Sequence, residues 1–307
     1  MMIKNGLERN VIMKKSVLAT MMAIFMATTP VLGAEISQIP ETNYQNIRIY
    51  SDGTKELKYL FVQTEKNNGK IEKNGRIQLQ NTPAILTVNG SLAVQDDMRV
   101  VDGTAYIPLR TMAELLGGSV QWNAQDKSVI FHNGSQSLIF VVDSRICMWN
   151  GKEIAMAKPM ISIDTTTYLP VRALADLTGY ETRYYTENAK ENIWSYPQIA
   201  LSKYPKDLEK LTPEQAAKIA EEKWILGLTA LEKYESKERS LECEEIYGID
   251  FTQTPVENDR YYLFPGKNTD MNLMVDKYTG AVYKYHKNRT MRFDPAKDGA
   301  KVMVWPA

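Results

Sequence analysis

The stretch VDGTAYIPLRTMAELLGGSVQW (residues 101–122) returns later in the chain as IDTTTYLPVRALADLTGYETRY (residues 163–184). The offset is a constant 62 residues, and eight of the 22 paired positions are identical, where unrelated segments would share about one or two. The identical pairs are Asp102/Asp164, Thr104/Thr166, Tyr106/Tyr168, Pro108/Pro170, Arg110/Arg172, Ala113/Ala175, Leu115/Leu177 and Gly117/Gly179. The chain therefore contains an internal duplication. The repeated unit is poor in His, Cys and paired carboxylates, which favours a building module over a reaction centre.

Each repeat is expected to open with a β-hairpin and to continue into a short helix. Asn-Gly pairs at residues 89–90 and 150–151 lie between alternating apolar residues, which is the strongest short hairpin signal because both turn positions need positive φ. The shared proline predicts the first turn of a helix, and the shared glycine predicts its end. Strands are then expected at 119–123 and 128–132 in the first repeat, at 181–185 and 192–196 in the second, and at 137–143 between them.

The repeated phrase also carries a family resemblance. YIPLRTMAELLG (residues 106–117), followed by VQWNAQDKSVIF (residues 120–131), resembles the copper amine oxidase N-terminal domain, also called the stalk domain, over about residues 84–200. The resemblance implies a secreted α+β module, common in Gram-positive bacteria and often joined to other envelope or extracellular domains. It does not imply copper chemistry, because in amine oxidases the copper and the oxidised tyrosine cofactor belong to a separate catalytic domain, which nothing in this sequence resembles.

Residues 1–34 are expected to be a secretory signal peptide. Lys14 and Lys15 precede an uncharged run that ends in small residues at Ala34. Threonines and a proline interrupt this run, which is close to the short limit of about 18 to 20 apolar residues for a spanning helix. We therefore expect no stable membrane span after cleavage. MKKSVLA, from Met13, is already a complete signal start, and translation is predicted to begin there.

Composition and cysteine usage narrow the classes of function. The chain has 44% hydrophobic and 24% charged residues, which is ordinary for a globular protein. Loss of residues 1–34 would remove four basic residues and one acidic residue from the 37 of each, leaving a net charge of −3, so no nucleic-acid partner is expected. Cys147 and Cys243 cannot form a disulfide framework. They either form one bridge between domains or pack as small hydrophobes.

Two segments flank the repeats. Residues 35–83 predict a small β extension that packs on the unit that follows, with a hairpin of Ile47–Tyr50 and Leu57–Val62 and a third strand at Arg76–Leu79. Residues 205–307 predict a C-terminal α+β domain, which begins with a capped helix at Thr212. Its strands are expected at 245–252, 260–264, 272–275 and 281–285. The predicted fold class is therefore α+β, with duplicated hairpin, short-helix and strand units followed by a helix and an antiparallel sheet.

The layout of residues 211–287, a helix followed by a strand meander, resembles a PepSY domain. That resemblance implies an inhibitory or chaperone-like role toward a secreted peptidase.

The candidate binding residues are two arginines and a set of aromatic residues. Arg110 and Arg172 each lie just inside a predicted helix, four residues before Glu114 or Asp176. They form either a structural ion pair with that residue or with Asp102 and Asp164, or an anion site for a wall polymer. Six aromatic side chains could form a glycan platform: Trp122, Trp149, Tyr184, Tyr185, Trp194 and Tyr196. At least half of these are expected in the core, because most lie in alternating strands.

No catalytic residues, cofactor or metal site are predicted. His132 and His286 are the only histidines and are far apart in the sequence. The sequence therefore predicts a secreted, non-catalytic scaffold or binding protein, extracellular or associated with the cell wall, whose partner is a cell-wall polymer or an envelope protein. The alternative is a regulator or inhibitor of a secreted peptidase that acts through the C-terminal domain.

Overall fold

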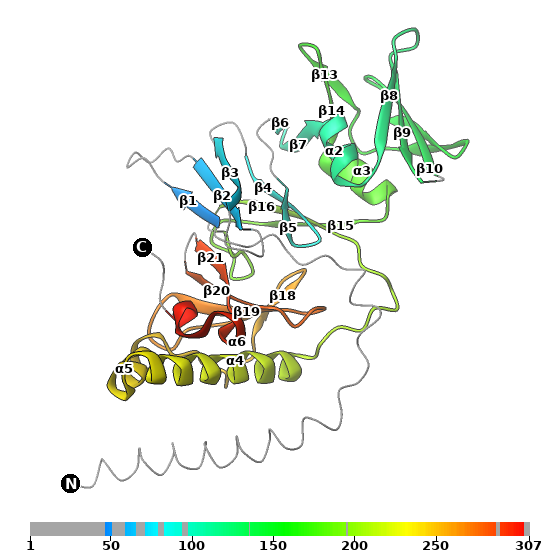
Figure 1. The fold of residues 1–307 in the computed structure, drawn as a ribbon. Helices are drawn as coiled ribbons and strands as arrows, with labels where there is room; N and C mark the ends of the chain where they lie inside the picture. The colour runs from blue at the N-terminus through cyan, green and yellow to red at the C-terminus, as the bar shows by residue number, and fades with distance from the viewer. Residues whose placement is uncertain are drawn as a thin grey trace, which may run out of the picture. The chain divides into compact units, whose positions relative to one another are not determined.

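The computed structural model describes residues 47–50, 59–65, 71–78, 83–93, 98–134, 136–194, 196–286 and 289–303 (Figure 1). The expected signal peptide and its start site lie outside these ranges. The described chain combines helices with several antiparallel sheets, so the predicted α+β class is confirmed.

The two repeats fold alike, element by element. The first repeat contains strands β6 (Arg99–Val101) and β7 (Thr104–Pro108), helix α2 (Leu109–Leu115) and strand β8 (Ser119–Asn123). The second contains β13 (Ile161–Ile163), β14 (Thr166–Pro170), α3 (Val171–Leu177) and β15 (Glu181–Tyr185). Every boundary is displaced by the 62 residues of the sequence offset. Gly117 and Gly179 follow the helices with φ of 74° and 81°, as expected for helix ends.

Strands β7 and β14 join the repeats at the centre of a four-stranded sheet with the order β13-β14-β7-β6. Their antiparallel register pairs Ile107 with Leu169, and each flanking Tyr with the Pro of the other repeat. Ile107 and Leu169 are equivalent positions and both are fully buried. The repeats are therefore related by a local two-fold axis that passes between these two residues.

Each repeat donates its opening hairpin to the other. The hairpin of β4 (Ile85–Val88) and β5 (Ser91–Ala93) pairs with β16 (Gln198–Ser202), which pairs with β15. The hairpin of β11 (Ile146–Trp149) and β12 (Lys152–Ala155) joins β9 (Ser128–Asn133) and β8 through β10 (Gln136–Val141). Both Asn-Gly turns have two positive φ angles, which confirms the hairpin predictions.

The last strand of the second repeat differs from the prediction. Residues 192–196 were expected to form it, but β16 begins at Gln198 instead. Asn192 organises an intervening loop, since its side-chain amide donates to the carbonyls of Thr186 at 2.8 Å and Tyr196 at 2.7 Å. This polar loop chemistry competes with strand pairing, and it places Trp194 in the core.

An eight-stranded antiparallel sheet contains both flanking segments. Its order is β17-β18-β19-β20-β21-β1-β2-β3. The strands are β17 (Val256–Glu257), β18 (Tyr261–Phe264), β19 (Met271–Asp276), β20 (Val282–His286), β21 (Arg289–Arg292), β1 (Ile47–Tyr50), β2 (Tyr59–Glu65) and β3 (Ile71–Gln78). The predicted hairpin of β1 and β2 is confirmed, with Ile47 opposite Val62. It extends the C-terminal sheet through β1 and β21, a pairing too distant in sequence to be predicted from local pattern.

Helices cover one face of this sheet. Helix α4 (Pro213–Tyr234) begins with the predicted capping box at Thr212 and Gln215, and it runs along the strands in Figure 1. Helix α5 (Lys237–Tyr247), helix α6 (Pro295–Asp298) and the 3₁₀ segment η3 (Gly299–Met303) complete this layer. The predicted strand at 245–252 is wrong, because α5 occupies its start. The signal that was missed is Ser236, whose hydroxyl accepts a hydrogen bond from the Arg239 N–H at 3.1 Å as an N-cap.

The two cysteines are free and buried in different clusters. Cys147 lies in the core of the repeats and Cys243 lies under α4. Burial raises the pKa of both thiols. Of the two alternatives, packing as small hydrophobes is therefore the one observed.

Arg260 connects the first hairpin to the C-terminal sheet. Its buried guanidinium donates to Asp276 Oδ2 at 2.8 Å and also to the carbonyl of Asn89 in the β4–β5 turn. A Cβ on Gly90 would lie 2.8 Å from Cδ of Arg260. Around this contact, Ile85 and Leu92 pack with Tyr261 and other side chains of β18–β20 in one cluster. The hairpin and the sheet therefore share a core.

Arg260→Met should destabilise the protein by about 3–5 kcal/mol, because it leaves the Asp276 carboxylate buried without its counter-charge. The matched control is Arg239→Met, since Arg239 forms an exposed pair with Glu242 at 2.7 Å and its loss should cost less than about 1 kcal/mol. Urea unfolding followed by circular dichroism measures both. Adding Asp276→Asn to Arg260→Met should restore part of the loss, and equal losses in the two single variants would contradict this role for Arg260.

Candidate functional site

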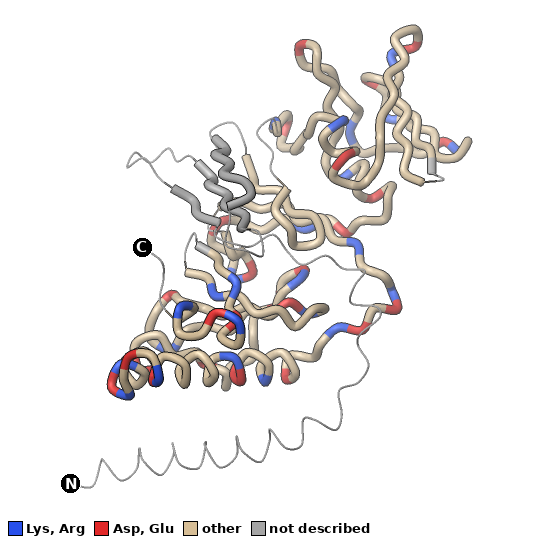
Figure 2. Tube along the Cα trace, in the orientation of Figure 1, with Lys and Arg blue, Asp and Glu red and all other residues tan. Residues whose placement is uncertain are grey.

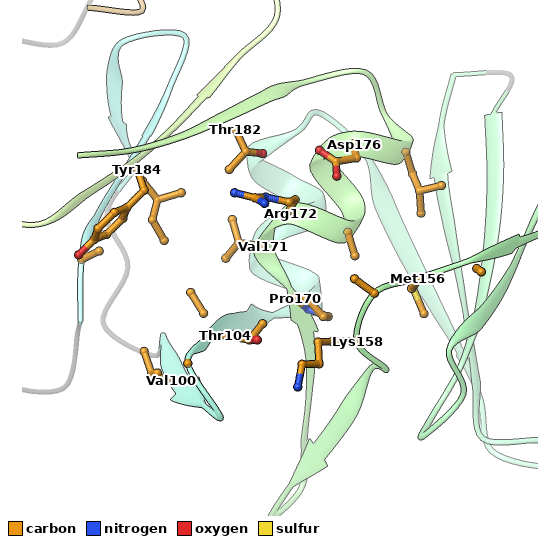
Figure 3. A pocket seen from close by; sticks show the side chains of 18 of the residues that line it. Val100, Thr104, Met156, Lys158, Pro170, Val171, Arg172, Asp176, Thr182 and Tyr184 are labelled. Carbon is orange, nitrogen blue, oxygen red and sulfur yellow. The ribbon is translucent and has the colours of Figure 1, made fainter. Parts of the chain in front are cut away.

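A groove of about 910 Å³ opens beside helix α3 (Figure 3). One face of α3 lines it, together with the β6–β7 turn region, the end of β12 with the residues that follow, and β15. The first repeat contributes Val100 and Thr104, whereas Ile154, Met156 and Val171 come from the second. The exchange of hairpins brings these segments together, so the groove belongs to neither repeat alone.

The groove is mainly apolar and has three charged side chains. Lys158 and Arg172 are basic and Asp176 is acidic. In Figure 3 the guanidinium of Arg172 extends toward Thr182 and Tyr184 of β15, while Lys158 lies on the other side of Pro170. Burial raises the pKa of Asp176, and the positive charge of Arg172 opposes this shift only in part. Positive charge therefore lies at two separate places along an apolar surface.

The two candidate arginines, Arg110 and Arg172, make no ion pair with the acidic residue four positions further on. Among the described residues, neither Arg110 nor Arg172 has a carboxylate within 4.0 Å, so the predicted ion pairs with Glu114 and Asp176 are not formed. Both arginines are exposed. Arg172 remains available to a ligand in the groove, whereas Arg110 does not line it.

The aromatic candidates do not form one platform. Tyr184 is 58% exposed in the groove, and the half-buried Trp149 also lines it. Trp122 is the equivalent of Tyr184 in the first repeat and is 50% exposed, but it does not line the groove. Trp194 is buried against β18–β20, so its assignment as a surface binding residue is wrong. Three of the eight candidates, Arg172, Trp149 and Tyr184, therefore meet at one site.

Sequence reasoning missed the apolar lining and Lys158. These positions look like ordinary strand and loop residues, and only the exchange of hairpins places them opposite α3. A groove of several hundred Å³ with an apolar surface and few polar groups is the usual form of a small-ligand or peptide site. Within the described ranges, no group of three or more His, Cys, Asp or Glu side chains could hold a metal ion.

A second, polar cavity of about 380 Å³ lies between β15–β16 and the β17–β19 region. Buried Lys277 donates to Glu257 Oε1 at 2.6 Å, and Lys210 reaches the same oxygen at 3.2 Å. Three buried atoms in its lining, Ser202 Oγ, Tyr204 Oη and Asp259 Oδ2, have no hydrogen-bond partner among the described residues. A water takes about 30 Å³, so the cavity is large enough to admit several waters beside these atoms.

The charges of this cavity act on one another. Burial raises the pKa of Asp259, and hydrogen bonding and the positive charges of Lys277 and Arg183 only partly oppose this. Burial also raises the pKa of Tyr185, which donates to Asp259 Oδ1, to about 12. The pKa of Lys277 is lowered by burial despite its pairing with Glu257. Burial therefore disfavours the charged form of Asp259 and of Lys277 alike.

Asp259→Asn should become progressively more stable relative to the unsubstituted protein as pH rises above the unfolded carboxyl pKa of about 3.9. A carboxyl whose pKa is raised in the folded state binds its proton more tightly there, so stability is lost as pH rises from the unfolded value of about 3.9 through the folded one. Asparagine does not ionise and keeps an acceptor for Tyr185.

Urea unfolding at several pH values measures the difference for each variant. Asp250→Asn is the control of opposite sign, because hydrogen bonds from Thr252 and Gln253 lower the pKa of Asp250. The stability of that variant relative to the unsubstituted protein should fall as pH rises toward the unfolded pKa of about 3.9 and should then level off. A pH-independent difference for Asp259→Asn would show that Asp259 has an ordinary pKa.

Comparison with known proteins confirms the resemblance found in the sequence. Residues 87–193 match the family model described as copper amine oxidase N-terminal domain, which covers about a third of the chain. In copper amine oxidases this domain is non-catalytic. The match includes both helices and the central sheet, together with most of the groove-lining residues. No curated protein matches the chain.

None of the helices in the described part of the chain combines the length and the apolar character needed to cross a lipid bilayer.

Proposed function

We propose that the chain is a secreted, non-catalytic scaffold or binding protein of the cell envelope, and that the groove beside α3 is its binding site. The observation that carries this proposal is the lining of the groove, an apolar surface built from both repeats with Arg172 and Lys158 placed along it. Few charged groups on an apolar surface are typical of sites that bind and orient a ligand. The secretory pattern of residues 1–34 supports the location.

The lining favours a ligand with an apolar surface and an anionic group. The groove lining contains two basic side chains, Arg172 and Lys158, and one acidic side chain, Asp176, whose pKa is raised. Arg172 is exposed and makes no ion pair with Asp176. Such a guanidinium favours carboxylate or phosphate, which it can bind through two parallel hydrogen bonds. Wall polymers carry such groups and envelope proteins carry carboxylates, so both classes of partner fit the proposed binding site.

The double variant Arg172→Gln with Tyr184→Ala should reduce co-sedimentation of the protein with insoluble cell walls. Loss of one hydrogen bond to a charged group costs about 1.5–3 kcal/mol, which corresponds to roughly tenfold or more in affinity. The duplication supplies a matched control, Arg110→Gln with Trp122→Ala, which removes the equivalent side chains outside the groove. That control should sediment like the unsubstituted protein.

Other outcomes would change the proposal. Equal loss in both double variants would place binding on both repeats instead of in the groove. Absence of co-sedimentation by the unsubstituted protein would contradict an envelope-binding role. Protease treatment of the walls before the assay distinguishes the partners, because it removes an envelope protein and leaves the polymer.

A second candidate function is regulation of a secreted peptidase through the C-terminal segment. The observation that favours it is the set of exposed apolar side chains on helices α4 and α5, Leu226, Tyr234, Leu241, Ile246 and Tyr247. Inhibition of a secreted peptidase that is lost on Leu241→Glu with Ile246→Glu, but retained by the groove variant, would favour this function over the first.

A further inference from the structure

The Asn-Gly turns of the two exchanged hairpins have the same backbone geometry. The pair at residues 89–90 has φ of 49° and 76°, and the pair at residues 150–151 has φ of 46° and 81°. Both are tight hairpin turns of the kind that needs positive φ at each central position.

The asparagine side chain of each turn is also tied to a neighbouring strand in the same way. Asn89 Oδ1 accepts a hydrogen bond from the Lys203 N–H at 2.7 Å. Asn150 Oδ1 accepts one from the Ser137 N–H at 3.1 Å. The duplication therefore places two copies of one turn in one chain, and the two differ only in what surrounds them.

The first turn is covered by the C-terminal strands. Gly90 is buried, and a Cβ at this position would lie 2.8 Å from Cδ of Arg260. The Arg260 guanidinium also donates to the carbonyl of Asn89. One buried side chain therefore holds both residues of this turn.

The second turn faces solvent. Asn150 and Gly151 are both exposed, and no atom of the described residues, apart from the chain neighbours, lies within 4 Å of the place that a Cβ on Gly151 would take. The strand that follows begins with the exposed residues Lys152 and Glu153. Figure 2 shows charged residues at the hairpin ends of the duplicated region, as expected for surface turns.

An asparagine followed by glycine can react with its own main chain, and the reaction needs only water besides the turn. The backbone nitrogen of Gly151 attacks Cγ of Asn150, and a succinimide ring forms as the bond from Cγ to Nδ2 breaks. The proton of the attacking nitrogen leaves with Nδ2 as ammonia. Water then adds to either ring carbonyl, and ring opening gives isoaspartate or aspartate. Glycine favours the attack because no side chain lies beside its nitrogen.

Ring closure requires the asparagine side chain to leave its hydrogen bond with the neighbouring strand, so the turn must first open locally. Strands β5 and β12 are both end strands of their sheets, and backbone pairing does not distinguish them. Leu92 of β5 is 6% exposed in the core shared with β18–β20, whereas β12 begins with exposed side chains. Opening the first turn therefore also disrupts core packing and the contacts of Arg260, and opening the second does not.

We propose that Asn150 is a site of spontaneous deamidation, and that the cover provided by Arg260 protects Asn89 from the same reaction. The exposed turn opens at the lower cost and itself supplies both reacting groups. This modification is independent of the groove and of the proposed function.

The products change a hairpin that forms one side of the groove. Either product adds a negative charge at the turn, and isoaspartate also adds one methylene to the main chain. Trp149 precedes the turn and Ile154 lies on β12, and both line the groove. Because the turn fixes the register of a hairpin, isoaspartate would shift these two side chains relative to each other. Only an effect on ligand binding rests on the proposed function.

Peptide mapping by mass spectrometry tests the proposal on the purified full chain, incubated in the folded state in heavy-oxygen water at mildly alkaline pH and physiological temperature. Asn150 should lose its amide and take up heavy oxygen, and the products should include isoaspartate, which chromatography separates from aspartate. The rate at Asn150 should exceed the rate at Asn89 at least roughly tenfold, since an additional opening cost of about 1.4 kcal/mol already gives that ratio.

The same chain unfolded in urea is the matched control. Glycine follows both asparagines, so the two rates should approach each other once the fold is lost. Equal rates at Asn150 and Asn89 in the folded chain would overturn the proposal. An intact Asn150 in the folded chain, over a time in which both sites react in urea, would also overturn it. Neither result depends on whether the groove binds a ligand.

Discussion

The pairing of β7 with β14 is the constraint on which the duplicated region depends. Ile107 and Leu169 face each other at its centre, and both are fully buried. Helices α2 and α3 each contact both strands, and each hairpin completes the sheet of the other repeat. A single repeat would therefore leave its helix, hairpin and central strand without most of their packing partners, so the duplicated pair is the smallest unit that closes a core.

The two-fold relation between the repeats is incomplete, and the two repeats differ in the surfaces that they present. Strand β10 is inserted between β9 and β11, whereas β16 pairs directly with β4. The outer face of the sheet β15-β16-β4-β5 is covered by the C-terminal strands, whereas Ile146, on the equivalent face of the five-stranded sheet, is 49% exposed. Of the two equivalent arginines, only Arg172 lines the groove. Equivalent residues of the two repeats therefore differ in their exposure and contacts, because the rest of the chain surrounds them differently.

The sequence predicted what depends on local chemistry. The Asn-Gly turns, the proline and glycine limits of the short helices and the capping box at Thr212 follow from backbone preferences within a few residues, and all are observed. Pairing between strands far apart in the chain could not be predicted from the sequence. Nothing local indicates that β1 pairs with β21 or that the hairpins are exchanged. The exchange of hairpins builds the groove, and the packing of the first hairpin against β18–β20 buries Trp194. Arg172 and Tyr184 were found by residue type, but their meeting required the fold.

The pairing of β1 with β21 joins residues 47–50 to residues 289–292 in one sheet. Closing a loop of that length must precede any gain from the contacts it makes, and such topologies fold slowly. During synthesis, strands β1–β3 cannot join the rest of the sheet until its other strands, more than two hundred residues later in the sequence, have been made. The order of synthesis therefore delays completion of the native sheet until nearly the whole chain is present, and the early strands are vulnerable to wrong pairing during that interval.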